Sequence, residues 1–318
     1  MNLGIAGSGM IVQDVLNLVR DIPDIKVKGI FARSIEKVQD LQDKHHIPDA
    51  FTNYEEMLSS QKIDTVYIGL SNHLHYQYAK SALLNGKHVI CEKPFTSSLE
   101  EFRELVTISK ERHLMLFEAI SNQYQEMYLQ LKNILPQLGR IKLVECNYSQ
   151  FSSRYQDFKD GYVHPVFDPQ KSGGALMDIN IYNIHFVVGL FGLPSDVQYF
   201  PIIENQIDTA GVLVLDYGTF KSVCIGSKDS HATSFLQIQG ENASLYIPNS
   251  ANDIQTLEYK EPKKETIHMK GDRLKHRMYD EFIQFTSFLK TENFDEVERR
   301  LIHSENVLKV VEKAKAKG

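Results

Sequence analysis

Residues 3–12 read Leu-Gly-Ile-Ala-Gly-Ser-Gly-Met-Ile-Val, and this stretch decides the fold of the N-terminal part of the chain. The apolar run 3–6 predicts a buried strand, and residues 11–20 have the periodicity of a helix. Gly7 permits a tight turn between them, and Gly9 lets a ligand approach the helix N-terminus, where oriented N–H groups bind pyrophosphate. The residues predicted to bind a dinucleotide here are Gly7, Ser8, Gly9, Met10 and Ile11.

One position departs from the dinucleotide-binding pattern. Its third glycine position, which usually holds Gly or Ala so that helix and strand pack closely, holds Val12. Taken alone, Gly7 and Gly9 could equally form an ordinary turn, so the interpretation depends on the rest of the chain.

Strand and helix patterns alternate over the first 120 residues. The strands are predicted at 3–6, 27–31, 65–70, 88–91 and 114–117 and the helices at 11–20, 35–44, 75–85 and 99–112. The strands are nearly continuous apolar runs, which is typical of a parallel sheet covered on both faces. We therefore predict an α/β Rossmann domain over residues 1–120.

The pattern changes after residue 120. We predict helices at 125–135, 175–190, 274–290 and 296–315, and strands at 141–148, 196–202, 210–217, 219–226, 233–239 and 243–248. The consecutive strands predict a meander. Residues 121–318 are thus expected to form an α+β domain with an open, mainly antiparallel sheet, for substrate binding and oligomerisation. Its C-terminal helices are free to pack back on the first domain.

Composition and charge exclude several classes of protein. The 318 residues carry a formal net charge of −6 with both signs interspersed, so nucleic acid is not an expected partner. The N-terminus lacks a signal-peptide pattern and no apolar run reaches about 18 residues, so we expect a cytoplasmic protein without a membrane partner. Cys91, Cys146 and Cys224 lack paired spacing and are interpreted as buried thiols, and no metal is expected.

The end of the second predicted strand bears on the choice of cofactor. Arg33 and Ser34 follow it, with Lys37 one helical turn further on. An acidic residue here would bind a ribose hydroxyl, whereas an arginine beside a hydroxyl suits a 2′-phosphate. NADP(H) is therefore the preferred cofactor and NAD(H) the second choice, unless Arg33 is only a solvated surface residue.

Several motifs resemble those of the Gfo/Idh/MocA family of oxidoreductases. They are Ser71-Asn72-His73-Leu74-His75, Gly86-Lys87-His88-Val89, Cys91-Glu92-Lys93-Pro94 and Ser172-Gly173-Gly174-Ala175-Leu176-Met177-Asp178. The resemblance implies that Lys93 lies beside the nicotinamide and the substrate, after a strand end where ligands of such sheets bind. It also implies a cis bond before Pro94 in many members. Further cofactor contacts are expected from Leu70, Ser71, Asn72, His75 and Glu92.

The predicted helix 175–190 carries a stripe of titratable side chains. Asp178, Tyr182 and His185 are spaced i, i+4 and i+7, so a regular α-helix would place them on one face. A solvent-facing polar stripe is the alternative. Many family members have histidine at the position of Tyr182, and a subgroup has tyrosine in an Asp-Ile-Gly-x-Tyr context, where this chain has Asn180 instead of glycine.

The resemblance and the chemistry together predict a role for each candidate. Tyr182 is the acid/base, with a pKa lowered by Lys93, and Lys93 stabilises the developing alkoxide and relays the proton. Asp178 orients the substrate hydroxyl or Lys93. His185 is a candidate substrate contact, although a structural role is favoured. The reaction is hydride transfer between NADP(H) or NAD(H) and a sugar, polyol or dihydrodiol-like substrate, and a non-catalytic nucleotide-binding sensor is the alternative.

Two further expectations concern substrate and assembly. The long loop 151–171 is expected to bring Arg154, Tyr155, Tyr162 and His164 near Gly173 and Gly174, where they would suit a neutral, multiply hydroxylated substrate. The open sheet is expected to form a homodimer or higher homo-oligomer, because one of its faces lacks helices. The apolar residues expected to drive this association are Leu213, Leu215, Val223 and Ile225.

Overall fold

The computed structural model describes residues 1–271 and 276–317 and divides the chain into two compact units. The first unit contains Met1–Ala119 and Met278–Glu305, and the second contains Ile120–Arg277 and Asn306–Gly318. Residues 274 and 275, where one predicted helix begins, lie outside the described residues.

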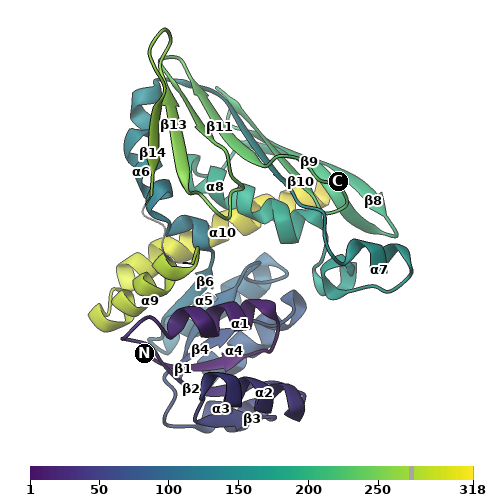
Figure 1. The fold of residues 1–318 in the computed structure, drawn as a ribbon, viewed down its shortest axis with the longest axis vertical. Coiled ribbons are helices and arrows are strands. Elements are labelled where there is room, and N and C mark those ends of the chain that lie inside the picture. The colour runs from purple at the N-terminus through teal and green to yellow at the C-terminus, as the bar shows by residue number, and fades with distance from the viewer. Residues whose placement is uncertain (272–275, 318) are drawn as a thin grey trace. The chain divides into compact units, whose positions relative to one another are not determined.

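The first unit is built on a parallel sheet of six strands in the order β3-β2-β1-β4-β5-β6, which confirms the predicted Rossmann architecture (Figure 1). The strands are β1 (Asn2–Ala6), β2 (Lys26–Phe31), β3 (Asp49–Phe51), β4 (Thr65–Ile68), β5 (His88–Glu92) and β6 (Leu116–Ala119). The helices between them are α1 (Met10–Val19), α2 (Ile35–His45), α3 (Tyr54–Ser59), α4 (His75–Leu84) and α5 (Leu99–Glu111). The short elements β3 and α3 were not predicted.

A helix from the end of the chain completes the first unit. In α9 (Tyr279–Thr291), the ring centroid of Phe282 lies 5.8 Å from that of Tyr67 in β4. The ring centroid of Phe285 lies 4.8 Å from that of Phe117 in β6. All four rings are buried, so α9 covers the sheet at these two strands. The first part of α10 (Phe294–Lys317) also belongs to this unit.

The second unit contains an eight-stranded sheet in the order β14-β13-β12-β11-β7-β10-β9-β8. Its strands are β7 (Ile141–Ser149), β8 (Asp196–Glu204), β9 (Ile207–Asp216), β10 (Lys221–Ser227), β11 (Phe235–Gly240), β12 (Ser244–Ile247), β13 (Thr256–Lys260) and β14 (Ile267–Lys270). The sheet is mainly antiparallel, as predicted, but the simple meander is wrong. The early strand β7 lies between β10 and β11 and runs parallel to β10. Neither β13 nor β14 was predicted.

Helices α6 (Glu126–Ile134), α7 (Tyr155–Lys159) and α8 (Ile181–Phe191) belong to the second unit. By length and composition the helical stretch Pro169–Phe191 could cross a membrane, but 78% of its apolar window is buried inside the structure. This burial is what the core helix of a packed domain shows.

The four apolar residues predicted to drive association through the open sheet divide between its two faces. Leu213 and Leu215 of β9 are fully buried, so they belong to the inner face and their predicted part in an open surface is wrong. The register pairs Val223 with Val214 and Ile225 with Val212, which alternate with these leucines and therefore point to the opposite face. Val223 and Ile225 are half-buried there.

Val12 stands where the dinucleotide-binding pattern has a glycine, and a glycine just after the neighbouring strand β4 makes room for its side chain. Val12 of α1 is fully buried, and a Cβ added to Gly69, just after β4, would lie 2.7 Å from a Val12 methyl carbon. The space that a third glycine would leave on the helix is thus provided by Gly69. Helix α1 can therefore approach the sheet closely in spite of its valine.

We expect Gly69→Ala to lower the free energy of unfolding by about 1–3 kcal/mol, because the added methyl group overpacks the contact with Val12. Adding Val12→Ala should recover part of this loss, so that the double variant loses less than the sum of the single variants. The free energy of unfolding is measured by urea unfolding, followed by circular dichroism, for the parent, the two single variants and the double variant. Strictly additive losses would show that the two side chains do not compete for the same space.

Candidate active site

The glycine turn of the first unit leaves its helix N-terminus open. Gly7 has a φ of +131°, and a Cβ there would lie 2.4 Å from the carbonyl oxygen of Gly69, so only glycine fits. A Cβ on Gly9, the N-cap of α1, would meet no atom within 4 Å. The first turn of α1 holds no acidic residue, and Met10 is 70% exposed. These features fit a pyrophosphate bound by the N–H groups of Ser8, Gly9, Met10 and Ile11.

The predicted 2′-phosphate contacts follow β2. Arg33 is exposed, and no carboxylate within the described parts of the chain pairs with it. The Ser34 hydroxyl caps α2 by accepting a hydrogen bond from the Lys37 amide at 3.4 Å. This cap uses an acceptor position of the hydroxyl and leaves its proton available for a phosphate oxygen.

His75 ties together the two loops that carry most of the other predicted cofactor contacts. Its Nδ1 lies 2.9 Å from the carbonyl oxygen of Pro94, and its Nε2 lies 3.1 Å from that of Leu70. The two carbonyls favour a charged ring, but complete burial has the larger effect and lowers the His75 pKa. His75 therefore holds the backbone at Pro94, next to Lys93, and at Leu70, next to Ser71.

The end of β5 places consecutive side chains in different surroundings. Glu92 is buried, and its carboxylate accepts a hydrogen bond of 2.7 Å from the buried Tyr67 hydroxyl. Burial, followed by the charge of Glu92, holds the Tyr67 pKa well above its usual value. Lys93 is half-buried, and the bond to Pro94 is cis, as the family resemblance implied. Asn72 begins a 3₁₀ turn (Asn72–Leu74) and is half-buried like Leu70 and Ser71.

Lys87 of the family motif has a structural role. It is buried, and its Nζ donates to the carbonyl oxygens of Ser60 and Ile63 at 2.9 Å and 2.7 Å. These bonds attach the start of β5 to the connection between α3 and β4, and burial lowers the Lys87 pKa. The motif therefore contributes to the support of the site.

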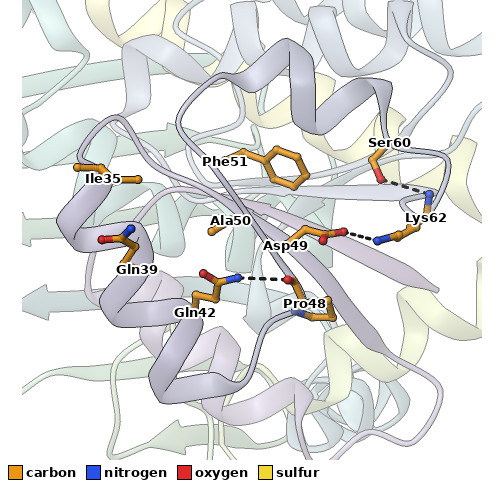
Figure 2. A pocket seen from close by; sticks show the side chains of 9 residues that line it. All are labelled: Ile35, Gln39, Gln42, Pro48, Asp49, Ala50, Phe51, Ser60 and Lys62. Atoms are coloured by element: carbon orange, nitrogen blue, oxygen red, sulfur yellow. Dashed lines mark hydrogen bonds and ion pairs between the residues drawn. The ribbon is translucent and has the colours of Figure 1, made fainter.

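A separate hollow of about 510 Å³ lies along the edge strand β3, beside α2 (Figure 2). The Lys62–Asp49 ion pair at 2.9 Å and the hydrogen bond from Gln42 to the Pro48 carbonyl lie in its wall. None of the residues predicted to bind cofactor or substrate lines it. It is therefore not the predicted dinucleotide site.

In the second unit, the helix that carries the predicted acid/base does not begin as an α-helix. Leu176–Asn180 forms a π-helical turn before α8, so Asp178 lies outside regular α-helical spacing. The prediction that Asp178 shares a face with Tyr182 and His185 assumed a regular α-helix. The chain is not α-helical at Asp178. Such π turns occur often at functional sites. The Asp178 side chain is 24% exposed, whereas Tyr182 is 6% exposed and His185 fully buried.

Asn180 packs in a way that explains how the chain tolerates it in place of glycine. It is fully buried, its amide donates to the Cys224 carbonyl at 3.1 Å, and its oxygen accepts from Asn183 at 2.9 Å. A Cβ added to Gly226 of β10 would lie 2.8 Å from the Asn180 Cβ. A glycine on the strand again provides the space that the helix residue needs.

A buried lysine beside Asp178 was not predicted from the sequence. Lys228 follows β10, and its Nζ lies 2.8 Å from the Asp178 carboxylate with 1% of its side chain exposed. Asp208 of β9 is also near its charge and accepts hydrogen bonds from the Leu176 amide and the Tyr199 hydroxyl, both at 2.7 Å. Burial nevertheless raises the Asp208 pKa. The only sequence signal for Lys228 is a charged residue at the end of an apolar strand.

The loop 151–171 is more ordered than predicted. Tyr155, Phe158 and Phe167 form a buried cluster with Ile207, so their rings are part of a core and Tyr155 offers no open aromatic face. Tyr162 is 66% exposed and lies edge-on to His164, whose Nε2 is 2.6 Å from an Asp157 oxygen. Arg154 is half-buried at the start of α7. The loop lies against Gly173, where an added Cβ would contact the backbone of residues 165–168.

Comparisons with known proteins agree with both units. Residues 1–120 match a family model described as an oxidoreductase family with an NAD-binding Rossmann fold, and residues 128–246 match the GFO/IDH/MocA C-terminal domain. The chain is 31% identical to scyllo-inositol 2-dehydrogenase (NADP(+)) IolU of Bacillus subtilis over 99% of this chain and 96% of that protein. It is 27% identical to trans-1,2-dihydrobenzene-1,2-diol dehydrogenase of Xenopus tropicalis over 70% of this chain and 68% of that protein.

A solved structure shows the same fold at low identity. The 3-ketoreductase KijD10 of Actinomadura kijaniata, in complex with NADP and TDP-benzene, superposes with a TM-score of 0.87 and 17% identity. The match covers 100% of this chain and 97% of that chain.

Proposed function

Because the chain belongs to the Gfo/Idh/MocA family of oxidoreductases, we propose that it interconverts a hydroxyl and a carbonyl group on a neutral polyol, sugar or dihydrodiol. The chain is an NAD(P)-dependent oxidoreductase. The observation that supports cofactor use most directly is the open N-terminus of α1 after Gly9, with no acidic residue in its first turn.

We propose that different residues of the first unit bind different parts of NADP(H). The N–H groups at the start of α1 bind the pyrophosphate, and Arg33 and Ser34 bind the 2′-phosphate. Leu70, Ser71, Asn72 and Glu92 shape the nicotinamide end, and His75 supports them from beneath by its two backbone contacts. We propose that this unit is the dinucleotide-binding domain and that the second unit binds the substrate.

We assign the chemical steps to three residues. The bound nicotinamide supplies the hydride donor or acceptor. Lys93 provides positive charge where the substrate oxygen becomes an alkoxide, and Tyr182 removes or returns the hydroxyl proton. Asp178 accepts a hydrogen bond from a substrate hydroxyl and so orients the carbon that reacts.

The second unit supports a substrate without net charge. The Asp178 carboxylate is already paired with Lys228 at 2.8 Å, and His164 is paired with Asp157 at 2.6 Å. The side chains of Tyr162, Arg154 and His164 and the Asp178–Lys228 pair offer hydrogen-bond donors and acceptors for hydroxyl groups. A scan of inositols, aldoses and dihydrodiols against their phosphorylated and carboxylated analogues tests this, and a strong preference for the charged analogues would contradict it.

We propose that the chain forms a homodimer through the open face of the second sheet. Phe200 and Ile202 of β8 are 57% and 58% exposed, and the half-buried Val212, Val223 and Ile225 lie on the same face by register. Together they form an apolar surface of the kind that marks interfaces. Light scattering that gives the mass of one chain at micromolar concentration would contradict this proposal.

We also propose that the protein is located in the cytoplasm. Cys146 and Cys224 are paired in register on β7 and β10 and are both free thiols, like Cys91. Thiols persist in reducing compartments. Recovery of the native protein with a disulfide between Cys146 and Cys224 would argue against this location.

We expect Lys93→Ala to lower kcat by at least about a hundredfold while NADP(H) still binds, because the charge is needed where the alkoxide develops. Tyr182→Phe should act in the same way through loss of the acid/base. Turnover of the preferred polyol and the dissociation constant for NADP(H) are measured together, with Lys80→Ala, at a half-buried lysine that pairs with Glu104, as control. A near-normal rate in Lys93→Ala would remove it from the mechanism.

We expect NADP(H) to bind at least about tenfold more tightly than NAD(H), since one charge-assisted hydrogen bond from Arg33 to a phosphate contributes about 1.5–3 kcal/mol. Arg33→Ala should remove most of this difference and leave NAD(H) binding nearly unchanged. Calorimetry on the parent and the variant gives the four dissociation constants, with Arg20→Ala as an exposed control. Equal losses for both cofactors would show that Arg33 does not recognise the phosphate.

A further inference from the structure

Lys228 is held in one position by contacts from several elements of the second unit. Its Nζ donates to the Val166 carbonyl at 2.6 Å, lies 2.8 Å from Asp178 and sits 4.4 Å from the centre of the Phe167 ring. Its backbone N–H donates to the Thr209 carbonyl, and its own carbonyl accepts from the Ser152 amide, both at 2.8 Å. Neither the side chain nor the backbone of Lys228 is therefore free to move.

The exposures of the two partners in the ion pair differ strongly. The Lys228 side chain is 1% exposed, so it cannot reach a molecule in solution, whereas that of Asp178 is 24% exposed. The carboxylate is thus the more exposed partner of a buried ammonium. Asp178 is therefore the contact through which we expect Lys228 to influence a bound molecule.

The pair also connects two segments that are far apart in the sequence. Asp178 belongs to the π turn before α8, and Val166 belongs to the loop 151–171 that carries Tyr162 and His164. One ammonium bonded to both segments fixes the distance between them. The π turn, which lacks regular α-helical bonding, is held from outside by this contact and by Asp208 at the Leu176 amide.

We propose that Lys228 is a positioning residue that holds the Asp178 carboxylate in one orientation and sets its distance from the loop 151–171. This inference rests on the proposed function, because it requires Asp178 to contact the substrate. Lys228 itself touches neither substrate nor cofactor. Its effect on the reaction is therefore expected to vanish when Asp178 can no longer act as a carboxylate.

The test is a double-variant cycle in the full-length enzyme with NADP(H) and its preferred neutral polyol. The variants are Lys228→Met, Asp178→Asn and the two combined, with Lys221→Met as the control. Lys221 begins β10, the strand that Lys228 follows, and pairs with Asp216 at 2.6 Å, but its side chain is 47% exposed. The values of kcat, KM, the NADP(H) dissociation constant and the melting temperature are measured for each.

We expect Lys228→Met to lower kcat about tenfold to a hundredfold, since misplacing a positioning group by about 1 Å has effects of this size. The dissociation constant for NADP(H) should stay within about twofold, and Lys221→Met should match the parent. In the Asp178→Asn background, adding Lys228→Met should change kcat by less than about twofold. Lys228→Gln, which removes the charge but keeps a polar side chain, provides the same comparison if the methionine variant does not fold.

Three outcomes separate the two proposals. An unchanged kcat in Lys228→Met, or in Lys228→Gln where that variant replaces it, overturns the positioning role while Asp178 keeps its own. A loss of kcat that persists in full in the Asp178→Asn background shows that Lys228 does not act through Asp178. A full rate in Asp178→Asn instead refutes the role of Asp178 in the proposed function.

Discussion

Close approach between a helix and a strand is the constraint on which both predicted sites depend. Helix α1 must lie near β4 for its N-terminus to reach the glycine turn, and the helix with Asp178 and Tyr182 must lie near β10. In both places the bulky residue is on the helix, Val12 or Asn180, and the space comes from a strand-side glycine, Gly69 or Gly226. Interiors are packed so densely that a single methyl group decides whether two elements fit.

Buried polar groups then determine where the functional side chains point. Beside Lys93, the His75 ring bridges the carbonyls of Leu70 and Pro94, and Glu92 binds Tyr67. Around Asp178, Lys228 and Asp208 hold the start of the helix. Such groups are costly to bury unless each has a partner, so removing one disturbs its neighbours. The candidate catalytic residues thus have neighbours that can orient them without touching a substrate.

Some of these features could be read from local sequence. The alternation of apolar runs and helical periodicity predicted the Rossmann sheet, and the motifs around Lys93 and Gly173 predicted the family. The short elements β3 and α3 were missed because three to six residues carry too little periodic signal. Leu213 and Leu215 were assigned to the wrong face because alternation separates two faces without saying which one a helix covers.

The sequence by itself determined the glycine turn before α1, the alternation of the main strands and helices over residues 1–120 and the side-chain chemistry of the candidates Lys93, Asp178 and Tyr182, because these depend on neighbours along the chain. Only the tertiary structure decided that β7 lies between β10 and β11, that a π turn containing Asp178 precedes α8, and that Lys228 is buried against Asp178. The strand pairings and the Lys228–Asp178 contact join residues about 50 to 100 positions apart, and no local pattern records contacts that arise only when distant segments compete for the same interior space.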